Sequence, residues 1–343
     1  MLPVPTVPIP SAPTISHVAN AAGVSHQTVS RVLNNHPAVS PRTRQKVQEA
    51  IATLGYRRNM AAHMLATGSS NLIGIMSSSD LPAGRSSPVF ALEHAARAAG
   101  YWVLIASVGD DNPHEAAAAI RHFQDCGVMS TVAIARTDAA LSATLTALGD
   151  ASTVLIMPER LSHGHPCVSF DQAEGVRDAM TLLRGLGHTR IAHIRGPEGA
   201  LQADERARVW ASMLSGGQSA DDLCVTGNWF AESGYRAAMQ LLALDEPPTA
   251  IFAANDQMAL GALRAISERG LRVPHDISVV GFDNMDGSNC SIPPLTTVAQ
   301  DMDALGAAAF ELICEGIRQM PPRAITLPAQ LIIRASTGAA PRR

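Results

Sequence analysis

Residues 14–34 read TISHVANAAGVSHQTVSRVLN, and this pattern predicts two short helices joined by a tight turn. Thr14 can cap the first helix and Ser25 the second, because a short hydroxyl side chain accepts hydrogen bonds from the free amides of a first helical turn. Gly23 supplies the backbone freedom that the turn between them needs. Two helices joined by a glycine-containing turn form a helix-turn-helix, whose second helix enters the major groove of DNA.

The start of the second helix carries side chains suited to reading base edges. His26, Gln27 and Arg31 are predicted to face outward. A glutamine can bind adenine through two hydrogen bonds, and an arginine can bind guanine in the same way. A small helical module with an ordinary polar surface is the alternative. The cap, the turn glycine and the polar face occur in register, which favours DNA binding.

Charge is unevenly distributed along the 343 residues. Residues 1–63 contain six Arg or Lys residues and one acid, Glu49, whereas the remainder has a net charge of −9. A basic head on an acidic body suggests that the head contacts a polyanion. Within the head, a third helix is expected from Ser40 or Pro41 to about Leu54, ended by Gly55.

The rest of the chain alternates short apolar runs with helical patterns. The runs are rich in Val and Ile and read NLIGIMSS, YWVLIASV, TVAIA, STVLIM, RIAHIRG, TAIFAAN and DISVVGF. Helical segments such as 88–99, 114–125 and 257–269 separate them. This order predicts an α/β body with doubly wound parallel sheets and helices on both faces.

Composition argues against several classes of protein. No apolar stretch approaches the roughly 20 residues of a membrane helix, and residues 1–13 lack the basic start of a signal peptide. We therefore expect a cytoplasmic protein without membrane contact. The five cysteines are scattered and form no C-x-x-C pair, which favours reduced thiols and no metal site. No phosphate-binding loop, nucleophile elbow or dinucleotide fingerprint occurs, so we expect no cofactor and no enzymatic activity.

Two longer motifs resemble the lac repressor family of transcription regulators. AAGVSHQTVSRVLN, residues 21–34, resembles the family's DNA-binding head. ANDQMALGALRAISERGLRVPHDISVVGFDN, residues 254–284, followed by IPPLTT, resembles its effector-binding body. The resemblance extends nearly without gaps from Thr14 to about residue 335. It implies a repressor whose affinity for a pseudo-palindromic operator is controlled by a small molecule.

The resemblance and the composition together divide the chain. The expected parts are a disordered tail (1–13), a helix-turn-helix head (14–58), a hinge helix with linker (59–70), an effector-binding and dimerisation core (71–337) and a second disordered tail (338–343). The resemblance implies that the core has two lobes of the periplasmic-binding-protein type. The first lobe would comprise about 71–170 and 299–328, and the second about 171–298 and 329–337.

Residues 59–68, NMAAHMLATG, predict a hinge helix of about two turns that Asn59 can cap. So short a helix is marginal in water and needs a partner helix or DNA. The resemblance implies insertion into the minor groove, where Leu65 would wedge between base pairs and small Ala62 permits close approach. A linker without structure describes the unbound state equally well. The expected DNA contacts are Thr14, Ser25, His26, Gln27, Thr28, Ser30, Arg31, Asn34, Tyr56, Asn59, Ala62 and Leu65.

Polar side chains follow several of the predicted strands, and ligands of open α/β sheets bind beyond the carboxyl ends of strands. The resemblance implies an effector site in the cleft, formed by Ser78, Phe170, Arg206, Trp229, Asn255, Asp283 and Met302. An aromatic ring and planar bidentate groups suit a sugar. Structural roles stay open as alternatives for four of these residues. Asn255 and Asp283 could be turn or cap residues at strand ends. Arg206 could pair with Asp204 or Glu205 at the surface, and Trp229 could belong to the hydrophobic core.

Departures from the family pattern bear on the effector and on assembly. Pro158, with Glu159 beside it, falls where a β-galactoside binder of the family has a carboxylate, and Ile134 replaces a polar residue. We therefore expect a less polar cleft, with a sugar or sugar derivative favoured and a purine as the alternative. His17 replaces the Asp that usually precedes Val-Ala. No leucine heptad follows residue 335, so we expect a homodimer. The head argues against a solute-binding transport protein.

Overall fold

The computed structural model describes residues 13–57, 70–78, 87–109, 112–148, 152–214 and 217–341. The chain divides into two compact units, residues 1–70 and 71–343. The smaller unit contains the predicted helix-turn-helix and the larger one contains the α/β body. In the described parts of both units, no helix is long and apolar enough to cross a membrane.

The first unit contains three helices, α1 (Ile15–Ala22), α2 (His26–Leu33) and α3 (Pro41–Leu54). Buried apolar side chains from all three form its core: Val18, Ala19, Val29, Val32, Val47 and Ala50. The predicted starts of α1 and α2 after Thr14 and Ser25, the turn at Gly23 and the bounds of α3 are confirmed. Ser25 Oγ accepts a hydrogen bond from the Thr28 amide at 3.2 Å and Ser40 Oγ accepts one from Thr43 at 3.2 Å. Gly23 and Gly55 end their helices in the left-handed conformation.

His17 contributes to the start of α1. The Thr14 amide donates a hydrogen bond to His17 Nδ1 at 3.1 Å, and the His17 amide donates back to the Thr14 carbonyl at 3.0 Å. An imidazole nitrogen therefore satisfies a free amide at the helix start, where a carboxylate would do the same in the usual family pattern.

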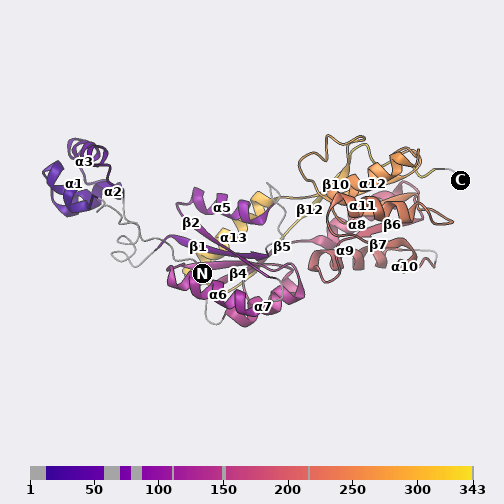
Figure 1. The fold of residues 1–343 in the computed structure, drawn as a ribbon, viewed down its shortest axis with the longest axis horizontal. Helices are drawn as coiled ribbons and strands as arrows, with labels where there is room; N and C mark the ends of the chain where they lie inside the picture. Colours follow the sequence, from indigo (N-terminus) through magenta and orange to yellow (C-terminus); the bar gives the residue numbers. More distant parts are fainter. Residues whose placement is uncertain are drawn as a thin grey trace, which may run out of the picture. The chain divides into compact units, whose positions relative to one another are not determined.

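The first sheet of the larger unit has six parallel strands. Their spatial order is β11 (Ala324–Leu327), β5 (Cys167–Phe170), β4 (Thr153–Ile156), β3 (Ser130–Ile134), β1 (Leu72–Ser78) and β2 (Trp102–Val108). Helices α5 (Pro88–Ala98) and α13 (Met302–Ile317) cover one face, and α6 (Pro113–Asp125) and α7 (Asp138–Leu148) cover the other (Figure 1). This sheet and its helices form the first lobe.

The second sheet also has six strands. Their order is β12 (Ala329–Ile332), β10 (Thr296–Gln300), β9 (Ser278–Asp283), β8 (Ala250–Ala253), β6 (Ile191–Arg195) and β7 (Cys224–Thr226), and only β12 runs antiparallel to its neighbour. Helix α8 (Gln172–Gly185) packs with α9 (Leu201–Ser212), and α11 (Ala231–Leu241) packs with α12 (Asp256–Glu268). Two short helices, η1 (Glu159–Leu161) and α10 (Ala220–Leu223), complete the body. The second sheet with α8–α12 forms the second lobe.

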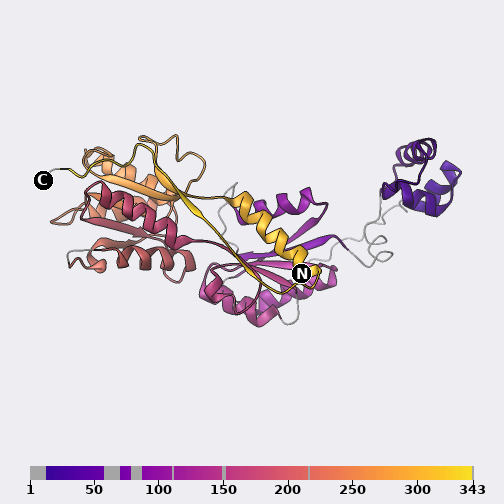
Figure 2. The ribbon, with the colours of Figure 1, turned by 180° about the vertical axis from the view of Figure 1, so that it is seen from behind.

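The chain passes three times between the lobes. It crosses after β5, after β10 and between β11 and β12, the last two strands forming the long yellow ribbon in Figure 2. The seven predicted apolar runs all form strands, and the doubly wound α/β class is confirmed. The second sheet is mixed at one edge, where β12 runs antiparallel to β10. Strand β12 follows β11 of the first sheet almost directly, and this connection is too short for the crossover that a parallel strand needs.

The expectation of a disordered tail from residue 338 is wrong for its first residues. The Gly338 amide donates to Ser278 Oγ at 3.1 Å, and the Ala340 amide donates to the Leu186 carbonyl at 2.9 Å. His188, buried in the second lobe, lies 3.0 Å from the Gly338 carbonyl through Nε2. These bonds hold the segment on the second lobe, and nothing in its Gly-Ala-Ala-Pro composition predicts them.

Candidate functional site

Helix α2 presents the side chains that were predicted to read DNA. His26, Gln27 and Arg31 are exposed, while Val29 and Val32 on the opposite side of the helix are buried in the head. The apolar side therefore orients α2, and its polar side remains available to a partner.

The other predicted DNA contacts differ in exposure and in the contacts that the structure shows for them. Ser25 and Thr28 hydrogen-bond each other through their hydroxyls at 2.9 Å, Tyr56 packs partly buried against the head core, and Thr14 and Asn34 are exposed. Ser30 is half-buried. Asn59, Ala62 and Leu65 lie outside the described residues, so the hinge stays a prediction of the sequence.

A cavity of about 150 Å³ lies between the two lobes, where strands of both sheets end. A single water needs roughly 10–15 Å³ by the same kind of measure, so the space suits a small molecule. Six predicted effector residues line it: Phe170, Arg206, Trp229, Asn255, Asp283 and Met302. Ser78 ends β1, and its side chain lies outside the described part of the structure.

Arg206 forms the floor of the cavity on the second lobe. Its Nε donates to Gln172 Oε1 at 2.9 Å, its Nη1 donates to the Ala254 carbonyl, and its Nη2 lies 3.4 Å from Asp283 Oδ1. The guanidinium carbon lies 3.6 Å from the centroid of the Phe282 ring. Only 3 % of the residue is exposed. Four different contacts therefore fix the plane of this guanidinium.

The surface alternative for Arg206 is excluded by these contacts and by the partners of its neighbours. Asp204 pairs with Arg195, and Glu205 pairs with Arg160 and Arg208. Arg206 turns inward from the same helix, because α9 places it on the side that faces the sheet.

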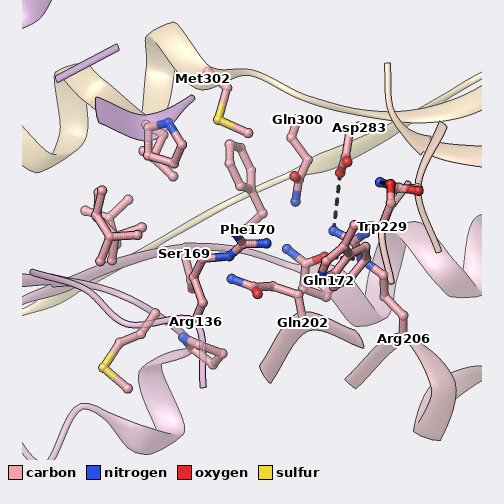
Figure 3. A pocket seen from close by; sticks show the side chains of 18 residues that line it. Arg136, Ser169, Phe170, Gln172, Gln202, Arg206, Trp229, Asp283, Gln300 and Met302 are labelled. Carbon is pink, nitrogen blue, oxygen red and sulfur yellow. Dashed lines mark hydrogen bonds and ion pairs between the residues drawn. The ribbon is translucent and has the colours of Figure 1, made fainter. Parts of the chain in front are cut away.

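Asp283 ends β9 and faces the cavity opposite Arg206 (Figure 3). Burial raises the pKa of its carboxyl to about 6, although Arg206 favours the ionised form. Its φ of 98° lies in the left-handed region, which a non-glycine residue adopts only at a cost. Strain of this kind at a polar side chain in a cavity is typical of functional sites.

Trp229 also has a left-handed backbone, with φ of 74°. Asn255 Nδ2 donates to the Trp229 carbonyl at 2.9 Å, while Asn255 Oδ1 accepts from the Met258 amide and caps α12. The Trp229 ring lies against Gly196, where a Cβ would come within 2.4 Å of it. The cap reading of Asn255 is therefore correct, and the same side chain also holds the tryptophan that lines the cavity.

The first lobe contributes a mainly apolar wall. Phe170 and Met302 lie together in Figure 3, and further apolar side chains of this lobe surround them: Pro88, Ile134, Ile156, Met157, Pro158, Val168 and Leu305. Pro158 and Ile134, the two positions that depart from the family pattern, thus line the cavity as apolar residues.

Five polar lining residues were not predicted: Arg136, Ser169, Gln172, Gln202 and Gln300. The cavity is accordingly more polar than the two departures suggested. A signal existed for Arg136, which follows the predicted strand TVAIA in the way that Asp283 follows its strand. No comparable signal marks Gln202, which lies in the first turn of α9.

Contacts between the lobes flank the cavity. The Leu201 amide donates to the Arg136 carbonyl at 2.8 Å, and Thr137 pairs with Ala200 as an isolated bridge. Arg160 Nη2 lies 3.0 Å from Glu205 Oε2. The segment around Arg136 therefore has two roles. It lines the cavity, and it makes contacts that hold the two lobes in this arrangement.

Comparisons with known proteins agree with both units. Residues 14–59 match the family described as bacterial regulatory proteins, lacI family, and residues 180–337 match a periplasmic binding protein-like domain. The lactose operon repressor of Escherichia coli (strain K12) is 36 % identical over 302 residues, which cover 88 % of this chain and 84 % of that protein.

Two solved structures are similar in fold. A lac repressor dimer bound to operator and the anti-inducer ONPF has a TM-score of 0.83 at 33 % identity, covering 96 % of this chain and 100 % of that one. A complex of the transcriptional regulator CelR with cellobiose has a TM-score of 0.68 at 29 % identity, covering 94 % and 99 %. The chain belongs to the lacI family of bacterial regulatory proteins and is a DNA-binding transcriptional repressor rather than an enzyme.

Proposed function

We propose that a small molecule bound in the cavity between the lobes controls the affinity of this repressor for its operator. The observation that carries the proposal is the convergence of six predicted residues, from separate elements of both lobes, on one cavity. Arg206 and Asp283 offer planar donors and acceptors, and Trp229 offers a flat apolar surface. This combination suits the hydroxyls and the apolar face of a sugar ring. The similar regulator that binds cellobiose supports a sugar or sugar derivative.

The coupling between effector and DNA would act through the arrangement of the lobes. A ligand shifts a conformational equilibrium only by its differential affinity for the two states. A ligand that touches both cavity walls meets different geometries in different lobe arrangements, because Arg206 and Trp229 belong to one lobe and Phe170 and Met302 to the other. We expect the effector to favour the arrangement with lower operator affinity, and so to act as an inducer.

The head would read the operator through α2, with His26, Gln27 and Arg31 at the base edges. We further propose that the protein acts as a homodimer on a pseudo-palindromic site, because two half-sites require a two-fold protein. Exposed apolar side chains support a partner surface on the first lobe. Phe90 on α5 and Trp102 and Ile105 on the edge strand β2 are 52–63 % exposed, and apolar exposure of this kind is typical of interfaces.

A gel shift tests the proposed function. The probe is the DNA upstream of the protein's own gene, with a panel of sugars, sugar derivatives and purines added one at a time. We expect a shifted complex without additives and its release by at least one sugar-type compound. Release by purines alone would favour the purine alternative over the sugar. If no compound alters the complex, the proposal of effector control is wrong.

A further inference from the structure

Glu205 lies between two arginines, one from each lobe. Its Oε2 lies 3.0 Å from Arg160 Nη2 of η1 in the first lobe, and its Oε1 lies 2.6 Å from Arg208 Nη2, three residues further along α9. The Glu205 side chain is only 13 % exposed, whereas both arginine side chains are more than half exposed. The carboxylate therefore makes one contact that crosses the lobes and one that stays within the second lobe.

A backbone contact crosses the lobes close to this ion pair. The Leu201 amide donates to the Arg136 carbonyl at 2.8 Å, and Glu205 follows one turn later on the same helix, α9. Leu201 is the first residue of α9, and the first amides of a helix have no acceptor within it. Its hydrogen bond therefore lasts only as long as the lobes keep this arrangement.

The same two turns of α9 also line the cavity. Gln202 and Arg206 are lining residues (Figure 3), and each directly follows a residue of α9 that contacts the first lobe. Pro158 lines the cavity from the first lobe, directly before η1. A ligand that displaces these side chains thus acts on the two elements that the ion pair joins.

We propose that the Arg160–Glu205 ion pair is a latch between the lobes, which favours this arrangement over the one that competes with it. This inference rests on the proposed function, because it names a contact that biases the equilibrium on which the effector acts. When the lobes part, Glu205 keeps Arg208 and does not become a buried charge without a partner, which would be costly. The latch therefore biases the equilibrium without locking it. Ion pairs with an exposed partner contribute modestly, so its loss shifts the equilibrium about two- to fivefold.

Hydrogen exchange of the Leu201 amide tests the latch on the full chain without any ligand. Arg160→Gln and Glu205→Gln should each make this amide exchange about two- to fivefold faster, measured at single-residue resolution by mass spectrometry. The double variant should match the single variants, because all three lack the same contact. Arg208→Gln is the matched control and should exchange no faster than the wild type, since it removes only the partner within the second lobe. The Val209 amide, inside α9, reports on unfolding of the helix and should exchange equally in all variants.

Titrations with operator DNA, and separately with the compound that releases it, test the regulatory role of the latch. Two ligands that prefer different arrangements respond in opposite directions to a shift between those arrangements. Arg160→Gln should therefore weaken the binding of one ligand and strengthen the binding of the other, each by about two- to fivefold. Arg208→Gln should change neither affinity.

The outcomes separate the latch from the proposed function. Exchange of the Leu201 amide at the wild-type rate in Arg160→Gln would overturn the latch. Faster exchange with both affinities unchanged, or with both shifted in the same direction, would overturn its regulatory role. If no compound releases the operator from the wild type, the proposed function fails, and the exchange rates still decide whether the ion pair holds the lobes.

Discussion

Arg206 Nη2 lies 3.4 Å from Asp283 Oδ1, an ion pair that joins helix α9 to the end of strand β9 across 77 residues of sequence. The pair closes the second-lobe side of the cavity, and both partners line it. Removing either one leaves the other partly or fully buried without its counter-charge, which is costly in a protein interior. The two side chains therefore act as one unit, and a ligand that binds one of them also changes the environment of the other.

Arg31→Ala tests base reading by the head. The side chain is exposed on α2, and a bidentate contact to guanine is worth about 1–3 kcal/mol. We expect a loss of that size on the cognate operator and a much smaller loss on DNA of scrambled sequence, both measured by fluorescence anisotropy at fixed salt. Equal losses on the two DNAs would identify Arg31 as a phosphate contact.

Gly196→Ala tests the role of Trp229. The new Cβ would lie 2.4–2.8 Å from three carbons of the indole ring, so the ring must move. If Trp229 covers one face of the effector, the dissociation constant rises at least tenfold in calorimetry with the compound that releases the operator complex. Gly185→Ala is the matched control, because its Cβ meets no atom within 4 Å. Unchanged affinity in the Gly196 variant would remove Trp229 from the site.

Trp102→Arg tests the dimer surface. Trp102 is 63 % exposed on the edge strand β2, and a charge placed in an apolar interface stays desolvated and unpaired on association. We expect sedimentation velocity to show a dimer for the wild type and mostly monomer for the variant at the same concentration. Arg97→Ala, an exposed change on the neighbouring helix α5, provides a comparison for general surface effects. A variant that remains dimeric would place the interface elsewhere.

His193 makes the stability of the second lobe depend on pH. The residue is fully buried, its Nδ1 donates to the Phe252 carbonyl at 2.8 Å and its ring stacks on Phe252. Burial lowers its pKa from 6.5 to about 3. Below about pH 6.5 the unfolded chain therefore binds a proton at His193 that the folded chain does not bind. The contribution of neutral His193 to the free energy of unfolding is present above pH 6.5 and is lost as the pH falls.

For this one group, the loss between pH 7 and pH 5 amounts to about 2 kcal/mol. Asp283 acts in the opposite direction, because its pKa is raised to about 6, so the contribution of His193 must come from a comparison with a variant. We expect urea denaturation to show a shallower loss between these pH values for His193→Gln than for the wild type. An identical pH dependence in both proteins would contradict this account of His193.

The sequence predicts most of the architecture because local chemistry decides it. Ser25 and Ser40 cap helices as their hydroxyls suggest, Gly23 and Gly55 end helices where the backbone turns left-handed, and Val- and Ile-rich runs form strands. The cavity is predictable only in part. Asn255 and Asp283 follow strands and could be placed at one edge of a sheet.

Other lining residues depend on how distant elements meet. Gln202 and Gln300 line the cavity only because the two lobes face each other, and no local pattern encodes that arrangement. The contacts of Gly338 and Ala340 likewise depend on Ser278 and Leu186, far away in sequence. Arg136 is the exception, because it directly follows a predicted strand. The sequence pattern alone could therefore have placed it at the edge of the sheet where ligands bind.

The most direct test of the central claim measures operator affinity and effector response in one titration. Labelled operator DNA is bound by the wild type and by Asp283→Ala, and the compound that releases the wild-type complex is added to each. We predict similar operator affinity for both proteins without the compound, and at least a tenfold loss at saturation for the wild type only. Calorimetry should show weakened binding of the compound to the variant. A variant that binds the compound as tightly as the wild type and releases DNA at the same concentration would contradict control from this cavity.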